Sequence, residues 1–146
     1  YMRAWRERSP AQWSFHLHTD ADNVALMQSR YRWLQPAYTQ MSSIQQADVA
    51  RYMYMHAWGG VYADLDIELK APEALTLMVA DTGGAVTLPF EKGRLVGQSI
   101  MIAPTKRHPF WKRLIDWLVE VHLKSTPASF ARRSIGSARP LTGRSP

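Results

Sequence analysis

The chain has 146 residues, with 18 Lys and Arg against 12 Asp and Glu, 46% hydrophobic residues and no cysteine. This length and apolar content predict one globular domain with its own core, because single domains commonly contain about 100–150 residues. The lack of cysteine excludes disulfide scaffolds, thiolate zinc sites and thiol catalysis. No apolar run approaches the roughly 20 residues that span a bilayer. The chain begins at Tyr1, and we therefore expect a piece of a longer protein.

The net charge of +6 is concentrated at the end of the chain. Residues 124–146 carry five basic side chains and no acidic ones, whereas residues 1–123 carry 13 basic and 12 acidic side chains. We therefore expect a folded domain over residues 1–124 and a basic tail rich in Ser, Pro and Arg over residues 125–146. A nearly neutral domain without a basic stripe predicts no nucleic-acid partner.

Helices dominate the expected elements of the first half. Pro10 ends a short first helix, an alternating apolar and polar pattern then predicts a strand, and Thr19, Asp20 and Asp22 are candidate caps of the next helix. A narrow apolar face and the Ser42-Ser43 cap mark the strongest helix, which ends at the glycine pair Gly59-Gly60. The predicted elements are a helix over Tyr1–Ser9, a strand over Trp13–His18, a helix over Ala21–Arg30, a helix over Tyr31–Met41 interrupted by Pro36, and a helix over Ile44–Trp58.

Strands and one long helix follow in the second half. The patterns predict strands over Val61–Glu68, Gly84–Pro89 and Ser99–Ala103, and a helix over His108–Leu123. The apolar face of that helix is expected to consist of Phe110, Leu114, Trp117, Leu118 and Val121. Strands that alternate with helices predict an α/β fold with a mostly parallel sheet.

Acidic side chains gather just after the glycine pair. Alternate residues of a strand point to the same face at about 3.3 Å per residue, so Asp64, Asp66 and Glu68 would share one face with Tyr62. Repulsion between carboxylates about 6–7 Å apart is relieved by a cation, and such oxygen ligands suit Mg²⁺ or Mn²⁺ completed by water and a diphosphate. An Asp-X-Asp sequence is also common on a solvent-facing edge strand, where the acids are simply hydrated. The other face would enter the core: Val61, Ala63, Leu65 and Ile67.

Asp48 and Arg51 are neighbours on the helix that precedes this strand, because they are three residues apart. The pair can be a surface ion pair that adds only a few tenths of a kcal/mol. It can also hold sugar hydroxyl groups beside the carboxylates, since it offers an acceptor and a planar fork of donors. The spacing alone does not decide between these interpretations.

Two adjoining motifs carry a resemblance to a known family. Gln46-Ala47-Asp48-Val49-Ala50-Arg51-Tyr52 and Trp58-Gly59-Gly60-Val61-Tyr62-Ala63-Asp64-Leu65-Asp66 together resemble the signature of the sugar-binding DXD glycosyltransferases. This is glycosyltransferase family 32, which includes initiating α-1,6-mannosyltransferases and inositolphosphoceramide mannosyltransferases. Segments on both sides extend the similarity to residues 5–123.

The resemblance implies a GT-A-like nucleotide-sugar-binding fold that lacks its first nucleotide-binding strand in this chain. It implies that Asp64 contacts the donor and helps to order the metal site, that Asp66 binds Mn²⁺ or Mg²⁺, and that both act in catalysis. It also implies that Asp48 and Arg51 bind hydroxyl groups of the transferred sugar and that Tyr62 lines the same pocket. The metal would act as a Lewis acid on the diphosphate leaving group.

The implied activity is metal-dependent, retaining transfer of a hexose of the mannose, galactose or glucose type. The implied partners are a GDP- or UDP-sugar donor and a glycan or glycolipid acceptor, with no nucleic acid. A full-length parent could be anchored in a membrane. In a eukaryote this would be the Golgi membrane, with the domain on the lumenal side, and in a bacterium the protein would be cytoplasmic or membrane-associated. The alternative function is an inactive remnant of the fold that binds a nucleotide sugar or a glycan without turnover.

Overall fold

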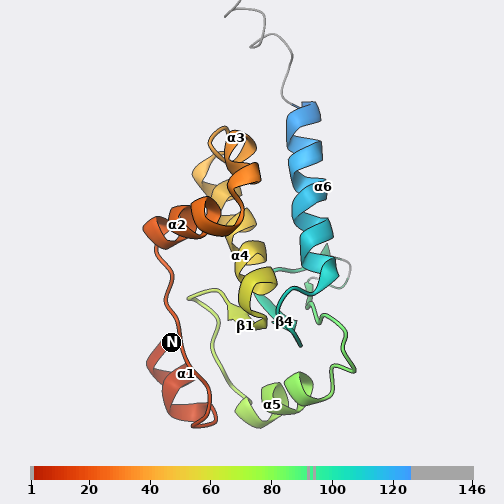
Figure 1. Ribbon diagram of the computed structural model, residues 1–146. Coiled ribbons are helices and arrows are strands. Elements are labelled where there is room, and N and C mark those ends of the chain that lie inside the picture. Colours follow the sequence, from red (N-terminus) through yellow and green to blue (C-terminus); the bar gives the residue numbers. More distant parts are fainter. Residues whose placement is uncertain (1, 92, 94, 126–146) are drawn as a thin grey trace, which may run out of the picture.

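The computed structural model describes residues 2–91, 93 and 95–125, so the predicted basic tail lies outside the described residues apart from Ser125. Helix α4 stands at the centre, with α2 and α3 on one side and α6 alongside it on the other, and β1 and β4 lie at its end (Figure 1). The elements are α1 (Met2–Arg8), α2 (Asp20–Arg30), the 3-10 helix η1 (Arg32–Leu34), α3 (Gln35–Tyr38), α4 (Ser43–Trp58), β1 (Gly60–Ala63), α5 (Pro72–Ala80), β2 (Phe90–Glu91), β3 (Leu95–Val96), β4 (Ile100–Ala103) and α6 (Pro109–Ser125).

The predicted caps of α2 and α4 and the predicted stop of α4 are confirmed, whereas the helix predicted over Tyr31–Met41 is divided into η1 and α3. Thr19 and Ser42 each form a capping box. The hydroxyl of the cap residue accepts a hydrogen bond from the backbone N–H three residues further along, and the side chain of that residue accepts one from the backbone N–H of the cap residue. Helix α4 ends at Gly59, whose φ is +68°. A Cβ atom at Gly59 would lie 2.9 Å from the backbone N of Lys106, so both the conformation and the close approach require glycine there.

The buried face of α6 agrees with the predicted one only in part, because Leu114 and Leu118 are half-buried against the core as expected but the most buried residues are others. Trp111 and Ile115 are 0% exposed, whereas Phe110 is 39%, Trp117 55% and Val121 39% exposed. Apolar residues occur on several sides of this helix, so its periodicity does not choose one face. The choice is made by packing against α4, where Ile115 joins a core that includes Tyr31, Leu34 and Met53.

The strands are shorter than predicted, and all described pairs are antiparallel. Strand β1 pairs with β4 in the register Gly60↔Ala103, and β2 pairs with β3. Residues 84–89 contribute only the isolated bridge Thr87↔Ile102, and residues 13–18 form no strand. An extended segment becomes a strand only when a neighbour pairs with its backbone, and sequence alternation does not supply that neighbour. The described fold therefore combines helices with small antiparallel sheets, in place of a mostly parallel sheet.

Three elements were not predicted from the sequence: α5, β2 and β3. Helix α5 begins with Pro72 in its first turn and buries Leu75, while Leu77 and Met78 stay exposed. Strands β2 and β3 contain two residues each, too few for a period-two pattern to be recognised. Among the described residues, no helix has both the length and the apolar character needed to cross a membrane.

Candidate functional site

The end of strand β1 places Asp64 at the centre of the site. The backbone N–H of Asp64 donates to Ser99 O at 2.8 Å, and its carbonyl accepts from Ile67 N at 3.0 Å, so the chain turns here. The strand predicted to continue to Glu68 therefore stops at Ala63. Asp66 is exposed in the turn, and Leu65, which the alternation placed in the core, is 63% exposed. Asp residues favour turns over strand interiors, and this preference holds for both Asp64 and Asp66.

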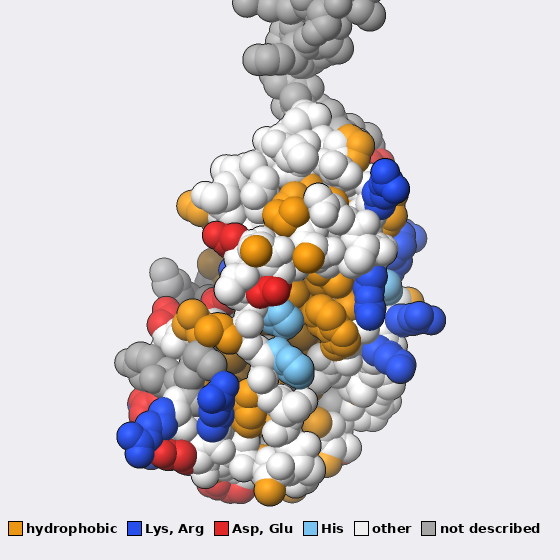
Figure 2. All heavy atoms as spheres, turned by 60° about the vertical axis from the view of Figure 1, so that its left-hand side comes forward, with side chains coloured by type: hydrophobic (Ala, Val, Ile, Leu, Met, Phe, Trp, Pro, Cys, Tyr) orange, Lys and Arg blue, Asp and Glu red, His pale blue; other side chains and the backbone are white. Residues whose placement is uncertain are grey.

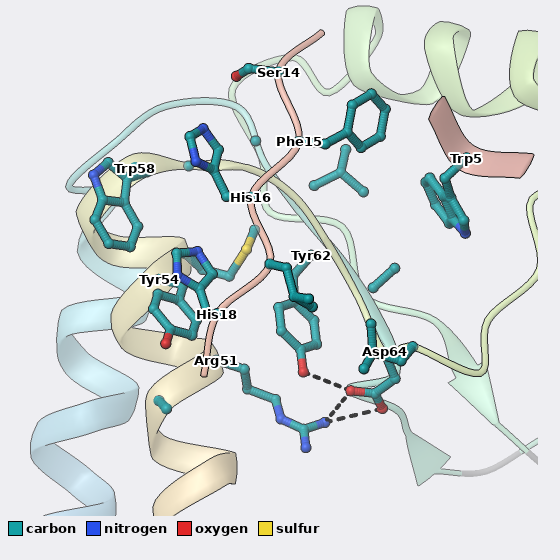
Figure 3. Close-up of a pocket in the computed structure, with 18 of the residues that line it drawn as sticks. Trp5, Ser14, Phe15, His16, His18, Arg51, Tyr54, Trp58, Tyr62 and Asp64 are labelled. Atoms are coloured by element: carbon teal, nitrogen blue, oxygen red, sulfur yellow. Dashed lines mark hydrogen bonds and ion pairs between the residues drawn. The ribbon is translucent and has the colours of Figure 1, made fainter. Parts of the chain in front are cut away.

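Arg51 connects α4 to the end of β1. Its Nη1 lies 3.3 Å from Oδ1 of Asp64, and its Nη2 lies 3.2 Å from Oδ1 of Asp48. The Arg51 side chain is only 13% exposed, whereas the carboxylates are about one-third exposed. The predicted neighbourhood of Asp48 and Arg51 on the helix is thus confirmed, and a buried guanidinium fixes two acids from different elements. Arg51 and Tyr62 converge on Asp64 (Figure 3).

Tyr62 supplies a hydroxyl donor to the same carboxylate. Its Oη donates to Asp64 Oδ1 at 2.7 Å, and its ring lies 5.4 Å from the Arg51 guanidinium carbon, within cation–π distance. Burial and the hydrogen bond to Asp64 raise the pKa of Tyr62 well above its usual range. The phenol therefore stays protonated at neutral pH and remains a donor.

Gln98, just before β4, closes the network from the other side. Its Nε2 donates to Asp48 Oδ1 at 3.0 Å, its backbone carbonyl accepts from Arg51 Nη1 at 3.4 Å, and its Oε1 accepts from Tyr52 Oη. Burial and the nearby Asp48 charge raise the pKa of Tyr52, which keeps that phenol protonated as well. Sequence reasoning missed Gln98 and Tyr52 as site residues. The available signal for Gln98 was its position directly before a predicted strand.

Helix α1 supports the turn that carries Asp66. Trp5 Nε1 donates to Ile67 O at 2.8 Å, and Arg8 Nη1 donates to Leu69 O at 3.0 Å. The side chain of Leu69 is 5% exposed and packs with Leu75 of α5. The turn is therefore held from α1 and from the core, while Asp66 itself makes no hydrogen bond or ion pair with the part of the chain that the structure describes.

A cavity of about 1040 Å³ opens beside Arg51, Tyr62 and Asp64. The segment Gln12–His18 forms one wall, while α4 and residues 59–65 form the others. Its lining is charged near Asp64, whereas the rest combines aromatic and aliphatic side chains. In the aromatic part His18, Tyr54 and Trp58 stack on one another, with 3.9 Å between the ring centroids of His18 and Tyr54 (Figure 3).

The acidic groups fit a divalent cation only in part. Among the described residues no cluster of three or more His, Asp, Glu or Cys side chains forms a protein cage for a metal. Asp66 offers a carboxylate that has no partner among the described residues, and Asp64 already accepts from Arg51 and Tyr62. Mg²⁺ and Mn²⁺ commonly bind through one or two carboxylates plus water and substrate phosphates, so this donor set suits an ion brought in with a diphosphate.

The structure thus brings together Asp48, Arg51, Tyr62 and Asp64, while Asp66 projects from the adjoining turn without contacting them. Three acids and one cation leave the group with an excess of negative charge. A phosphate group would be repelled here unless a cation accompanied it. The roles of the five residues in binding and catalysis stay predictions.

Comparison with known proteins gives the family. Residues 1–80 match the family described as "Glycosyltransferase sugar-binding region containing DXD motif". The chain is 35% identical over 100 residues to inositol phosphoceramide mannosyltransferase 1 of Schizosaccharomyces pombe, an alignment that covers 67% of this chain and 30% of that protein. The chain thus spans less than a third of the length of this relative. No solved structure matches. Because the family match covers more than half of the chain and contains both motifs, the chain belongs to the glycosyltransferase family with a DXD sugar-binding region.

Proposed function

We propose that this chain provides the donor-sugar site of a metal-dependent hexosyltransferase that uses a GDP- or UDP-sugar. The observation that carries the proposal is the position of Arg51, whose side chain is largely shielded from solvent between Asp48 and Asp64 at the end of β1. A surface ion pair would leave the guanidinium in water, whereas here it is 13% exposed beside a cavity.

The donors and acceptors of this cluster match the chemistry of a sugar. Hydroxyl groups both donate and accept, so they can bond to carboxylate oxygens and to guanidinium N–H groups at the same time. The Nε of Arg51 is buried and has no hydrogen-bond partner among the residues that the structure describes. A buried donor without a partner is costly, and a ligand oxygen would satisfy it.

Asp66 and Asp64 would hold Mn²⁺ or Mg²⁺ together with the donor diphosphate. When bound, the metal supplies Lewis-acid stabilisation of the negative charge on the leaving diphosphate. Arg51 and Asp48 would bind and orient the hexose, and Tyr62 would hold Asp64 in place by its hydroxyl hydrogen bond. Retention of the anomeric configuration and a GT-A-like fold of the longer protein belong to the same proposal, on the strength of the family.

The acceptor we propose is a glycan or a glycolipid. The relative from S. pombe is named as an inositol phosphoceramide mannosyltransferase, which supports a mannose donor and a lipid-linked acceptor as the first compounds to test.

A thermal-shift panel of GDP- and UDP-sugars, each with and without Mn²⁺, tests the proposal. A ligand that binds only the folded state raises the melting temperature by mass action, so one sugar nucleotide should raise it more in the presence of Mn²⁺ than either component alone. Slow release of free sugar from that donor would establish turnover, whereas binding without hydrolysis would identify the inactive remnant. No shift with any donor would contradict the proposal.

A further inference from the structure

A second cluster of functional side chains lies at the end of β1 opposite to Asp64. Its centre is the contact between Tyr31, which follows α2, and His56 in the last turn of α4, with 2.7 Å between Tyr31 Oη and His56 Nδ1. The cations Arg30, Arg107 and Lys112 surround this pair, and all three side chains belong to exposed residues. They come from three different elements, so the fold itself assembles them.

Two exposed tryptophans lie among these cations. The Arg30 guanidinium carbon lies 5.5 Å from the ring centre of Trp58, and Lys112 Nζ lies 4.7 Å from the ring centre of Trp33. Trp58 is 48% and Trp33 46% exposed. Tryptophans that are half in water beside cations are typical of protein interfaces and of membrane interfaces, where one end of the ring is apolar and the other is wet.

The turn before α6 contributes the remaining basic groups. Lys106 and Arg107 are exposed, and the turn is held against the end of α4 because Arg107 N donates to His56 O at 2.6 Å. Gly59 makes this approach possible, since a Cβ atom there would lie 2.9 Å from Lys106 N. We call Arg30, Trp33, Trp58, Lys106, Arg107 and Lys112 the basic tryptophan surface.

The electrostatic balance of this surface is positive. Burial, Lys112 and Arg107 all lower the pKa of His56, and the nearby carboxylate that opposes them is Asp116, which is paired with Lys112 at 2.6 Å. Figure 2 shows Lys and Arg side chains gathered along the margin of one face, next to hydrophobic and His side chains.

We propose that the basic tryptophan surface binds the headgroup region of a lipid bilayer that contains anionic lipids. Lys and Arg near an anionic leaflet are attracted by its surface potential, and Trp rings favour the interface because they have an apolar body and a polar N–H. Trp58 of this surface also lines the aromatic part of the cavity, so a bilayer bound here would lie beside that part of the cavity, at the opposite end of β1 from Asp64.

The tryptophan environment favours a bilayer over a nucleic acid. Stacking of a base requires an uncovered aromatic face. Arg30 covers Trp58, which also stacks with His18 at 5.4 Å, and Lys112 covers Trp33. Each ring thus already has a cation over one face, and Trp58 stacks on a second ring as well, whereas the cations themselves belong to exposed residues that lipid headgroups can reach.

Vesicle flotation of the full chain tests this surface without any use of enzymatic activity. The protein should float with phosphatidylcholine vesicles that contain about one-third phosphatidylserine and stay behind with pure phosphatidylcholine, and added salt should release it. Soluble glycerophosphoserine should not compete, because one headgroup lacks the surface potential of a leaflet. Equal binding to neutral vesicles, displacement by the soluble headgroup, or no binding would overturn the proposal.

Matched charge variants locate the binding face. Arg30→Gln/Arg107→Gln should weaken binding to the anionic vesicles by about fivefold per charge, or about 25-fold in all. The control Arg6→Gln/Lys70→Gln removes the same charge from exposed residues elsewhere and should change binding by less than about twofold. Equal losses in the two variants would show that only net charge matters and would overturn the assignment. Unchanged melting temperatures will establish that both variants are folded.

Quenching of tryptophan fluorescence by brominated lipids tests whether Trp33 and Trp58 contact the bilayer. Tryptophan fluorescence of the wild type should be quenched on binding, and Trp33→Phe/Trp58→Phe should lose most of that quenching. Undiminished quenching in this variant would place other tryptophans at the membrane and contradict the proposal. Preferential retention of the wild type by single-stranded RNA in place of anionic vesicles would likewise overturn it.

Discussion

Arg51 and Asp64 meet across the gap between α4 and the end of β1, with 3.3 Å from Nη1 to both carboxylate oxygens. The guanidinium also pairs with Asp48 and donates to the Gln98 carbonyl, so its planar fork bonds in two directions at once. A lysine carries the same charge but has no such fork.

Arg51→Lys should therefore keep the fold and weaken donor binding. The loss of hydrogen bonds between charged groups predicts a decrease in affinity of about tenfold or more, measured by calorimetric titration with the donor and Mn²⁺. Arg113→Lys, on the exposed side of α6, is the matched control and should leave the affinity unchanged. Unchanged donor affinity in Arg51→Lys would show that the Asp48–Arg51 pair is only a structural ion pair.

Gln98→Ala removes the amide that bridges Asp48 and Tyr52. Both partners then lose a hydrogen bond, which predicts a loss of about 1 kcal/mol in the free energy of unfolding and a decrease of about fivefold in donor affinity. Urea unfolding and calorimetry measure the two effects. Gln28→Ala replaces an exposed glutamine on α2 and should change neither quantity. If the loss of stability occurs without a loss of affinity, Gln98 is a structural residue only.

Trp5→Phe keeps most of the packing of α1 but removes the indole N–H that donates to Ile67 O. The turn that carries Asp66 should loosen, with a stability loss of about 1 kcal/mol and a measurable decrease in Mn²⁺ affinity in the presence of donor. Trp117→Phe, at a site that is 55% exposed, serves as the control. Equal Mn²⁺ affinity in both variants would show that α1 does not position Asp66.

The packing of α6 gives a prediction on stability alone. Ile115→Ala leaves a cavity at a site that is 0% exposed and should lower the free energy of unfolding by about 2–5 kcal/mol. Val121→Ala, on the face that the sequence pattern had assigned to the core, should cost less than about 1 kcal/mol because Val121 is 39% exposed. Denaturant unfolding of both variants decides between the two faces, and a larger loss for Val121→Ala would contradict the structure.

Local chemistry made the helix boundaries predictable. The caps at Thr19 and Ser42 and the stop at Gly59 depend on neighbouring residues, so short motifs carry them. The strands were harder, because β1 is defined by its partner β4 about 40 residues further along the chain. The turn at Asp64 was missed for the same reason, since Arg51 and Ser99 hold that residue and neither contact is visible in the alternation of residues 61–68.

The site residues that lie within the two sequence motifs were predictable. Asp48 and Arg51 share a helix, and Tyr62 and Asp64 share a short segment, so spacing placed each pair correctly. Gln98 reaches the site from a separate part of the chain, and Trp5 acts on it through a backbone carbonyl. Contacts of this kind depend on tertiary packing and leave no periodic signal in the sequence.

Mn²⁺-dependent hydrolysis of the donor sugar by the wild type and by Asp66→Asn tests the central claim most directly. Asp66→Asn removes one negative charge from an exposed carboxylate that has no partner in the described part of the chain, so the fold should be unaffected while metal-dependent release of free sugar falls by at least about tenfold. Glu68→Gln, two residues further along and also exposed, should retain wild-type release. Equal rates in the wild type and Asp66→Asn at limiting Mn²⁺ would contradict the account of a metal-dependent donor site at the end of β1.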